Sequence, residues 1–215
     1  MTPRQLANAA SIVIFGAFLL SALVVNSSRV RASAEDSQGD SRVRRGFDIA
    51  PVPLNLAHKN RELVGLGSYL VNVFECDGCH SAGPATQYIT PTGNPFFLSP
   101  PLVEERINPA TYLGGGRVFP SPFGTGSPNI ISRNLTPDAS GLPIGGDTFA
   151  EFEHTIRTGI DPDQLHPVLP SPFNGALLQV MPWPALQEMT DHDLRAIYEY
   201  LSAIPCIQTT GHDCS

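Results

Sequence analysis

One pentapeptide, Cys76-Asp77-Gly78-Cys79-His80, constrains this chain more than any other feature of its sequence. Two cysteines three positions apart lie on one side of a short helical turn, where both thiols can add to the vinyl groups of a haem as thioethers. The histidine directly after the second cysteine then reaches the iron. We therefore predict one covalently bound haem c, attached through Cys76 and Cys79, with His80 as an axial ligand.

Two other uses of a Cys-x-x-Cys pair fit this sequence less well. A redox-active dithiol lies in a βαβ pattern, which this sequence lacks, and a structural zinc site needs a second ligand pair at zinc spacing, which does not follow. The attachment motif occurs once in the 215 residues. A single haem is therefore expected.

A sixth ligand for the iron is sought among the methionines, because a thioether raises the potential of a haem that only transfers electrons. Met181 lies in a proline-rich loop over residues 160–189, where Pro182 disfavours the helical conformation for it. The alternative is that Met181 only fills a gap in the core. Met189 fits better as a hydrophobic contact at a helix start, and His166 is a further loop candidate. We predict Met181 as the ligand.

The N-terminal segment predicts export. Residues 6–25 carry no charge, which suits either a membrane-spanning helix or the apolar part of a signal peptide. Ala32-Ser33-Ala34 resembles a cleavage site, but Arg29 and Arg31 come just before it. Residues 1–30 are therefore expected to be a signal peptide or an N-terminal membrane anchor. The rest would lie on the periplasmic side of the bacterial inner membrane, anchored there or soluble after cleavage.

The charge of the exported part narrows the choice of partners. The first 34 residues hold three basic residues and no acidic one, so the remainder has 10 basic and 20 acidic residues and a formal charge of −10. Such an acidic domain argues against nucleic acid as a partner. A redox protein with a basic docking patch is the better expectation, with membrane complexes as electron donor and acceptor and membrane contact through an uncleaved N-terminus.

The domain organisation follows from composition. Residues 31–60 are polar, charged and interrupted by proline, which predicts a flexible linker. A single folded domain is expected over residues 61–205. A C-terminal tail follows over residues 206–215, where Cys206 and Cys214 are either a disulfide, as an oxidising compartment favours, or two free thiols.

Helical periodicity predicts an all-α domain. Helices are expected over residues 61–75, 149–158 and 191–203, each with apolar residues at helical spacing. Gly65 and Gly67 weaken the first of these helices and predict a close backbone crossing there. Residues 81–146 are dense in turn-forming residues and are expected to wrap, as long irregular loops, around a flat apolar ligand.

Several segments together resemble the class I cytochrome c family, over about residues 61–205. A glycine-containing helix with Tyr69 leads into the attachment motif, and a Met-Pro pair precedes a C-terminal helix. Within that family the chain is similar to haem domains in cytochrome subunits of bacterial membrane-bound dehydrogenases. The matching segments are Asn134-Leu135-Thr136-Pro137-Asp138, Arg157-Thr158-Gly159, Met181-Pro182 and Met189-Thr190-Asp191. The resemblance implies His80 and Met181 as axial ligands.

The expected function is one-electron transfer, as a carrier or as the cytochrome subunit of a membrane respiratory or dehydrogenase complex, without catalysis by this chain itself. The related dehydrogenase subunits typically hold three haem motifs, and this chain holds one. The alternatives are a haem c peroxidase or a gas- or ligand-binding sensor. A di-haem peroxidase needs two attachment motifs, and a sensor needs an open iron position that Met181 would fill.

Overall fold

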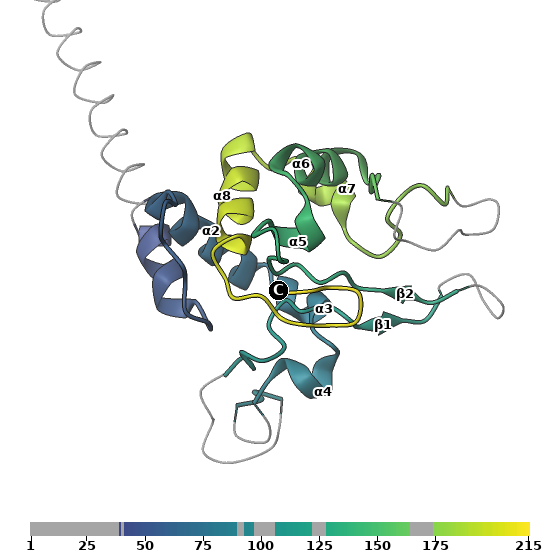
Figure 1. Cartoon of the computed structure of the whole chain (residues 1–215), viewed down its shortest axis with the longest axis horizontal. Coiled ribbons are helices and arrows are strands. Elements are labelled where there is room, and N and C mark those ends of the chain that lie inside the picture. The colour runs from purple at the N-terminus through teal and green to yellow at the C-terminus, as the bar shows by residue number, and fades with distance from the viewer. Residues whose placement is uncertain (1–38, 40, 90–92, 97–105, 122–127, 164–173) are drawn as a thin grey trace, which may run out of the picture. The chain divides into compact units, whose positions relative to one another are not determined.

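The computed structural model describes residues 39, 41–89, 93–96, 106–121, 128–163 and 174–215 (Figure 1). The helix leading into the attachment motif, α2, spans Arg61–Val73. It begins at Asn60, whose side chain accepts hydrogen bonds from the backbone N–H groups of Glu62 and Leu63. Such a cap satisfies amide donors that have no partner within the helix, which is why the helix begins there.

The predicted close crossing of α2 is confirmed. α8, Asp191–Leu201, lies beside α2 (Figure 1), and a Cβ on Gly67 would overlap the carbonyl oxygen of Ala196. Only glycine lets the two backbones approach this closely. Ala196 is fully buried at the contact. The crossing holds the helix before the attachment motif against the C-terminal helix.

Residues 42–60 differ from the flexible linker predicted over residues 31–60. Residues 42–49 are helical, and a Cβ on Gly46 would overlap the carbonyl oxygen of Gly65 in α2. The hydroxyl of Ser68 donates to the carbonyl oxygen of Gly46 at 2.6 Å. The charges of this segment mask an apolar pair, Val43 and Phe47, which lies on one helix face at a spacing of four residues.

The helix before the proline-rich loop has the predicted bounds. α6 spans Phe149–Thr158 and starts with a capping box, in which the Thr148 and Glu151 side chains each bond the other's backbone amide. It ends at Gly159, whose φ of 73° is the left-handed conformation that stops a helix. Phe152 and Ile156 form its buried face. The predicted helix over residues 191–203 is shorter in the structure, because α8 ends at Leu201.

The remaining elements are short, as expected for a loop-rich domain. They are the helices α3 (Cys76–His80), α4 (Pro84–Gln87), α5 (Pro143–Gly146) and α7 (Trp183–Leu186), and the strands β1 (Val118–Phe119) and β2 (Ile130–Ile131). The two strands pair antiparallel, with Val118 opposite Ile131. The domain is thus helical with few strands, and this pair is the departure from the predicted all-α class.

The core joins these helices to the irregular segment. Tyr112 and Leu113 belong to no helix, yet they are fully buried with residues of α2 and α8. The hydroxyl of Tyr112 donates to Oδ1 of Asn72 at 2.9 Å and lies 2.9 Å from the hydroxyl of Tyr200. A buried hydroxyl needs such partners, so the loop is fixed by polar as well as apolar contacts.

Within the described ranges, no helix combines the length and apolar composition that crossing a membrane would require. The predicted signal peptide or anchor, residues 1–30, lies outside those ranges.

Candidate functional site

A change of backbone direction after α2 produces the short helix that carries the two cysteines. Glu75 has a φ of 55°, a left-handed conformation that is unfavourable for a residue with a Cβ. α3 therefore starts as a new helix and does not continue α2. Its single turn places Cys76 and Cys79 on neighbouring positions of one face.

The predicted site residues line one cavity of about 630 Å³. Cys76, Cys79 and His80 contribute from α3, and Met181 contributes from the loop before α7, about a hundred positions later in the chain. Much of the remaining wall is apolar, and it includes Val71, Phe152, Ile156, Leu186, Leu194 and Leu201. This volume is in the usual range for cofactor sites, and the wall would exclude water from a flat apolar ligand.

The His80 ring has one nitrogen already engaged. Its Nδ1 lies 2.8 Å from the carbonyl oxygen of Arg133, and because a carbonyl can only accept, Nδ1 carries the proton. Nε2 is then the unprotonated nitrogen. Burial lowers the pKa of His80, more than the bond to Arg133 raises it, so the neutral ring is favoured. A neutral imidazole with its other nitrogen bonded to a carbonyl is the usual form of a metal-binding histidine.

The backbone around His80 is held by a glycine. The amide of Gly115 donates to the carbonyl oxygen of His80 at 2.7 Å. A Cβ on Gly115 would lie 2.5 Å from both the carbonyl carbon of Arg133 and the amide nitrogen of Asn134, and its φ is 69°. Gly115 therefore brings the His80 main chain and the Arg133–Asn134 peptide together.

The thiol of Cys76 is not poised for dithiol redox chemistry. Burial raises its pKa to about 12, and the neighbouring Cys79 adds to this shift. Reactive Cys-x-x-Cys pairs depend on a lowered pKa, because the thiolate is the nucleophile. Cys76 is half-buried, Cys79 is exposed, and both are free thiols in this structure. The site thus fits covalent attachment better than disulfide exchange.

Asp77, between the two cysteines, joins α3 to the core. Its Oδ1 accepts a hydrogen bond from the amide of Leu113 at 2.8 Å, and its side chain is 4 % exposed. Its other oxygen has no hydrogen-bond partner among the described residues. Burial raises the pKa of Asp77 to about 6, against the opposing effect of the Leu113 amide. The carboxyl thus anchors the attachment turn to the irregular segment.

The loop that carries Met181 is held against α6. The amide of Leu178 donates to the carbonyl oxygen of Gly159 at 2.8 Å, and the indole N–H of Trp183 donates to the carbonyl oxygen of Leu178 at 3.1 Å. Trp183 also packs directly on Gly159. These contacts fix the chain on both sides of Met181, which is half-buried in the cavity wall.

Arg157 fixes the next part of the chain. Its guanidinium donates to the carbonyl oxygens of Gln187 and Met189 and pairs with Asp191 at 2.6 Å. Met189 lines the same cavity as Met181 and also packs into the core near Leu70 and Ala196. The two methionines thus share the cavity, but Met189 has the additional packing role predicted for it.

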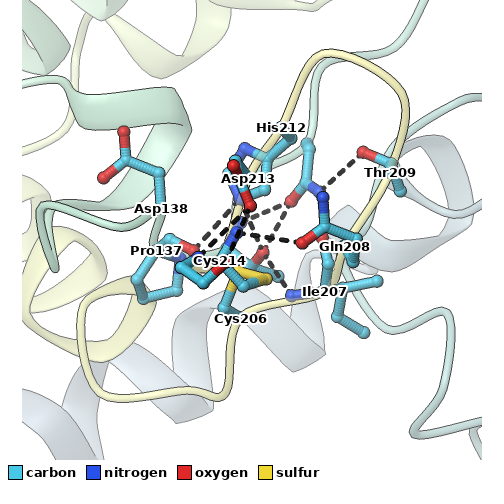
Figure 2. The surroundings of a disulfide bond; sticks show 12 residues. Pro137, Asp138, Cys206, Ile207, Gln208, Thr209, His212, Asp213 and Cys214 are labelled. Atoms are coloured by element: carbon cyan, nitrogen blue, oxygen red, sulfur yellow. Dashed lines mark hydrogen bonds between the residues drawn. A yellow bond between two sulfur atoms is a disulfide. The ribbon is translucent and has the colours of Figure 1, made fainter.

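The C-terminal tail is part of the site's support. Cys206 and Cys214 form a disulfide, and Figure 2 shows the closed loop lying against the Pro137–Asp138 segment. Asn134 donates to the carbonyl oxygen of Ile207 at 2.8 Å. His212 is 7 % exposed, and its Nε2 lies 3.0 Å from the carbonyl oxygen of Pro137. The tail therefore holds the segment whose carbonyl binds His80.

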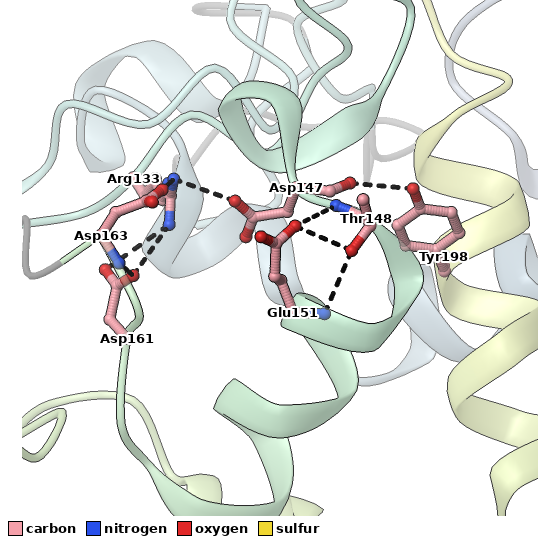
Figure 3. A network of polar contacts seen from close by, with 7 residues as sticks. All are labelled: Arg133, Asp147, Thr148, Glu151, Asp161, Asp163 and Tyr198. Atoms are coloured by element: carbon pink, nitrogen blue, oxygen red, sulfur yellow. Dashed lines mark hydrogen bonds and ion pairs between the residues drawn. The ribbon is translucent and has the colours of Figure 1, made fainter.

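Arg133 has a second set of partners on its side chain. Figure 3 shows its guanidinium between Asp147 on one side and Asp161 and Asp163 on the other. Burial raises the pKa of Asp147 to about 6, and the Arg133 charge opposes that shift. Arg133, Asp147 and Asp161 all line the cavity. With Glu75, they form the charged part of a mostly apolar wall.

The comparisons with known proteins find cytochrome subunits of bacterial dehydrogenases. No family model matches the chain. It is 30 % identical over 138 residues to the alcohol dehydrogenase (quinone) cytochrome c subunit of Gluconacetobacter polyoxogenes, covering 64 % of this chain and 21 % of that protein. It is 28 % identical over 159 residues to the fructose dehydrogenase cytochrome subunit of Gluconobacter japonicus, covering 73 % and 24 %.

A third relative is the gluconate 2-dehydrogenase cytochrome c subunit of Pantoea cypripedii, 28 % identical over 143 residues, with 66 % of this chain and 23 % of that protein covered. The similarities support a cytochrome c family. The chain spans less than a quarter of the length of these cytochrome subunits.

Sequence reasoning missed several residues that support the candidate site. It gave Arg133 no role, although its carbonyl oxygen binds the His80 ring, and it did not predict that Asp77 and Gly115 hold the attachment turn in place. Arg133 directly precedes the Asn134–Asp138 segment that carried the resemblance, and this position was the available signal. His166, the further loop candidate for the sixth ligand, lies outside the described residues.

Proposed function

We propose that this chain holds one haem c through thioether bonds from Cys76 and Cys79, with His80 and Met181 as axial ligands, and that it transfers single electrons. The observation that carries the proposal is the state of His80. Its Nδ1–H is engaged by the Arg133 carbonyl, while its ring lines the same cavity as both thiols and Met181. This arrangement leaves Nε2 as the nitrogen available to a metal.

The bound haem would supply exchange between ferric and ferrous iron. The chain's own residues would do the rest. Cys76 and Cys79 would prevent the group from dissociating, and Met181 would hold the iron so that substrates are excluded. The apolar wall around Phe152 and Leu194 limits access of water, which favours the less charged ferrous state. Each of these properties suits electron transfer.

The location and partners that we propose rest on the relatives and on the acidic net charge of the chain. The relatives are cytochrome subunits of dehydrogenases, so we infer that this chain is a non-catalytic electron carrier or subunit on the periplasmic side of the inner membrane. Its single attachment motif fits one haem domain of the class I type. The excess of acidic residues favours a redox partner with a basic docking surface.

The alternative functions need an iron with an open position. A haem c peroxidase or a gas-binding sensor must let a small molecule reach the iron. Met181 lies in the cavity wall on a loop that is held on both sides by hydrogen bonds. A fixed thioether of this kind supports a closed site.

The test is covalent haem loading in a bacterial host that carries out cytochrome c maturation. The full chain should retain haem through denaturing electrophoresis. The Cys76→Ala/Cys79→Ala variant should not, because both thioether bonds are lost. Cys206→Ser/Cys214→Ser is the matched control: it also removes two cysteines but should keep its haem. A fully loaded Cys76→Ala/Cys79→Ala variant, or a wild-type chain without haem, would contradict the proposal.

A further inference from the structure

Arg133 makes polar contacts through both its backbone carbonyl and its guanidinium group. Its carbonyl oxygen accepts the hydrogen bond from Nδ1 of His80 at 2.8 Å. Its guanidinium pairs with Asp147 at 3.3 Å, Asp161 at 3.4 Å and Asp163 at 2.7 Å, as Figure 3 shows. The same residue therefore joins the candidate iron ligand to a cluster of three carboxylates.

Two of the carboxylates hold the guanidinium away from solvent. The side chains of Asp147 and Asp161 are 8 % and 6 % exposed, and that of Arg133 is 21 % exposed. Asp163 is half exposed, so water and salt screen its pairing. Asp147 lies just before α6 and Asp161 shortly after it. The guanidinium therefore joins the two segments that flank this helix. Only the planar fork of arginine can address both carboxylates at once.

The peptide bond between Arg133 and Asn134 is also held from the Asn134 side. The side chain of Asn134 donates to the carbonyl oxygen of Ile207 and to the hydroxyl of Thr209 in the disulfide-closed tail. Gly115 packs against the Arg133–Asn134 peptide from the side of His80. The carbonyl of Arg133 is therefore fixed by its own side chain on one flank and by Asn134 on the other.

We propose that Arg133 is a positioning residue for His80: its bridge between Asp147 and Asp161 holds the carbonyl oxygen that accepts the Nδ1–H of His80. The inference rests on the proposed function only in taking His80 as the iron ligand. A firm hydrogen bond at Nδ1 increases the basicity of the imidazole and stabilises ferric iron. Loosening the carbonyl should therefore weaken the bond and raise the reduction potential.

The test uses haem-loaded full-length Arg133→Lys. Lysine keeps the positive charge but binds as a point charge, so it cannot bridge Asp147 and Asp161. Deuterium exchange of the His80 Nδ1–H, followed by NMR on ferrous protein with labelled histidine, should become about tenfold faster, which corresponds to about 1.4 kcal/mol. The reduction potential should rise. Asp191→Asn is the control: it removes a carboxylate paired with Arg157, and it should leave the exchange rate unchanged.

Asp161→Asn provides a second route if Arg133→Lys does not fold. It breaks one arm of the bridge and leaves Arg133 in place, so it should also speed the exchange. An unchanged exchange rate in the folded variants would overturn the inference, even if the potential moves, because charge alone can shift a potential. Covalent haem in the wild type reports separately on the proposed function, so the two failures are distinguishable.

Discussion

Gly159 lies directly against the indole of Trp183, so closely that a Cβ on the glycine would overlap the ring. The contact joins the end of α6 to the start of α7. Between these two points runs the chain that carries Met181. The position of the candidate sixth ligand thus depends on a residue with no side chain, 22 positions earlier in the sequence.

Gly159→Ala should disturb both stability and the Met181 loop. Alanine at a φ of 73° costs about 1–2 kcal/mol, and the overlap with Trp183 adds to that cost. Chemical denaturation should show at least this loss. The long-wavelength absorption that methionine gives ferric haem should weaken as the loop shifts. Gly141→Ala is the control, because Gly141 has a φ of 78° but open space around it, so only the backbone cost should appear. Equal behaviour of the two variants would contradict the packing argument.

Met181→Ala should open the iron without releasing the haem. Loss of the thioether should lower the reduction potential, because thioether ligation stabilises ferrous iron and axial ligands tune haem potentials over about 0.8 V. The ferric spectrum should become high-spin, and added small ligands should bind.

Met189→Ala is the comparison for Met181→Ala, since both side chains line the cavity. It should lose packing and some stability while the spectrum stays low-spin. The ligand assignment is wrong if only the Met189 variant becomes high-spin.

Loss of the Cys206–Cys214 disulfide should destabilise the domain. The two cysteines are eight positions apart, and opening a loop of this size should lower the free energy of unfolding by about 2–3 kcal/mol in the chain-entropy model. Denaturation of Cys206→Ser/Cys214→Ser measures the change. Treating the wild type with a thiol reductant should give the same loss, because thioether bonds to haem are not reduced. If the reductant leaves the free energy of unfolding of the wild type unchanged, the tail is held by its hydrogen bonds alone.

Asp77 should make stability depend on pH. Its pKa is about 6 in the folded chain and ordinarily 3.8, so between these values the folded state retains a proton that the unfolded state has lost. This contribution is complete below about pH 4 and is lost as the pH rises through 6. The free energy of unfolding should thus fall by up to about 2–3 kcal/mol over this range. Asp77→Asn should reduce the fall in denaturation midpoints measured against pH and leave the part that Asp147 contributes, because the pKa of Asp147 is also raised to about 6.

Asp138→Asn should have the opposite effect on the pH dependence, because it removes a contribution to the free energy of unfolding that grows as the pH rises. Hydrogen bonding from Ser140 lowers the pKa of Asp138, so its contribution is present at neutral pH and is lost on acidification. For the Asp77 prediction, an unchanged slope of the free energy of unfolding against pH in Asp77→Asn would show that other groups set the pH dependence.

Three helices were predictable, and α6 has its predicted bounds, because the signals for a helix are local. Thr148 and Glu151 form a capping box from residues three positions apart, and Gly67 sits at the expected crossing. The helix over residues 42–49 was missed, because its place in the fold depends on Gly65 of α2 and on the hydroxyl of Ser68. Those partners lie about twenty positions away in the chain, so the apolar pair Val43 and Phe47 alone does not identify them.

The sequence by itself predicted the attachment chemistry. Cys76, Cys79 and His80 lie close together in the chain, and their spacing alone suits one haem. Only the tertiary structure decided what surrounds that motif. The acceptor for His80 is the carbonyl of Arg133, 53 positions away, and Met181 enters the same cavity from a distant loop. A backbone carbonyl is chemically the same in every residue, so no side-chain pattern can identify it. Its role arises only when folding brings it to the ring.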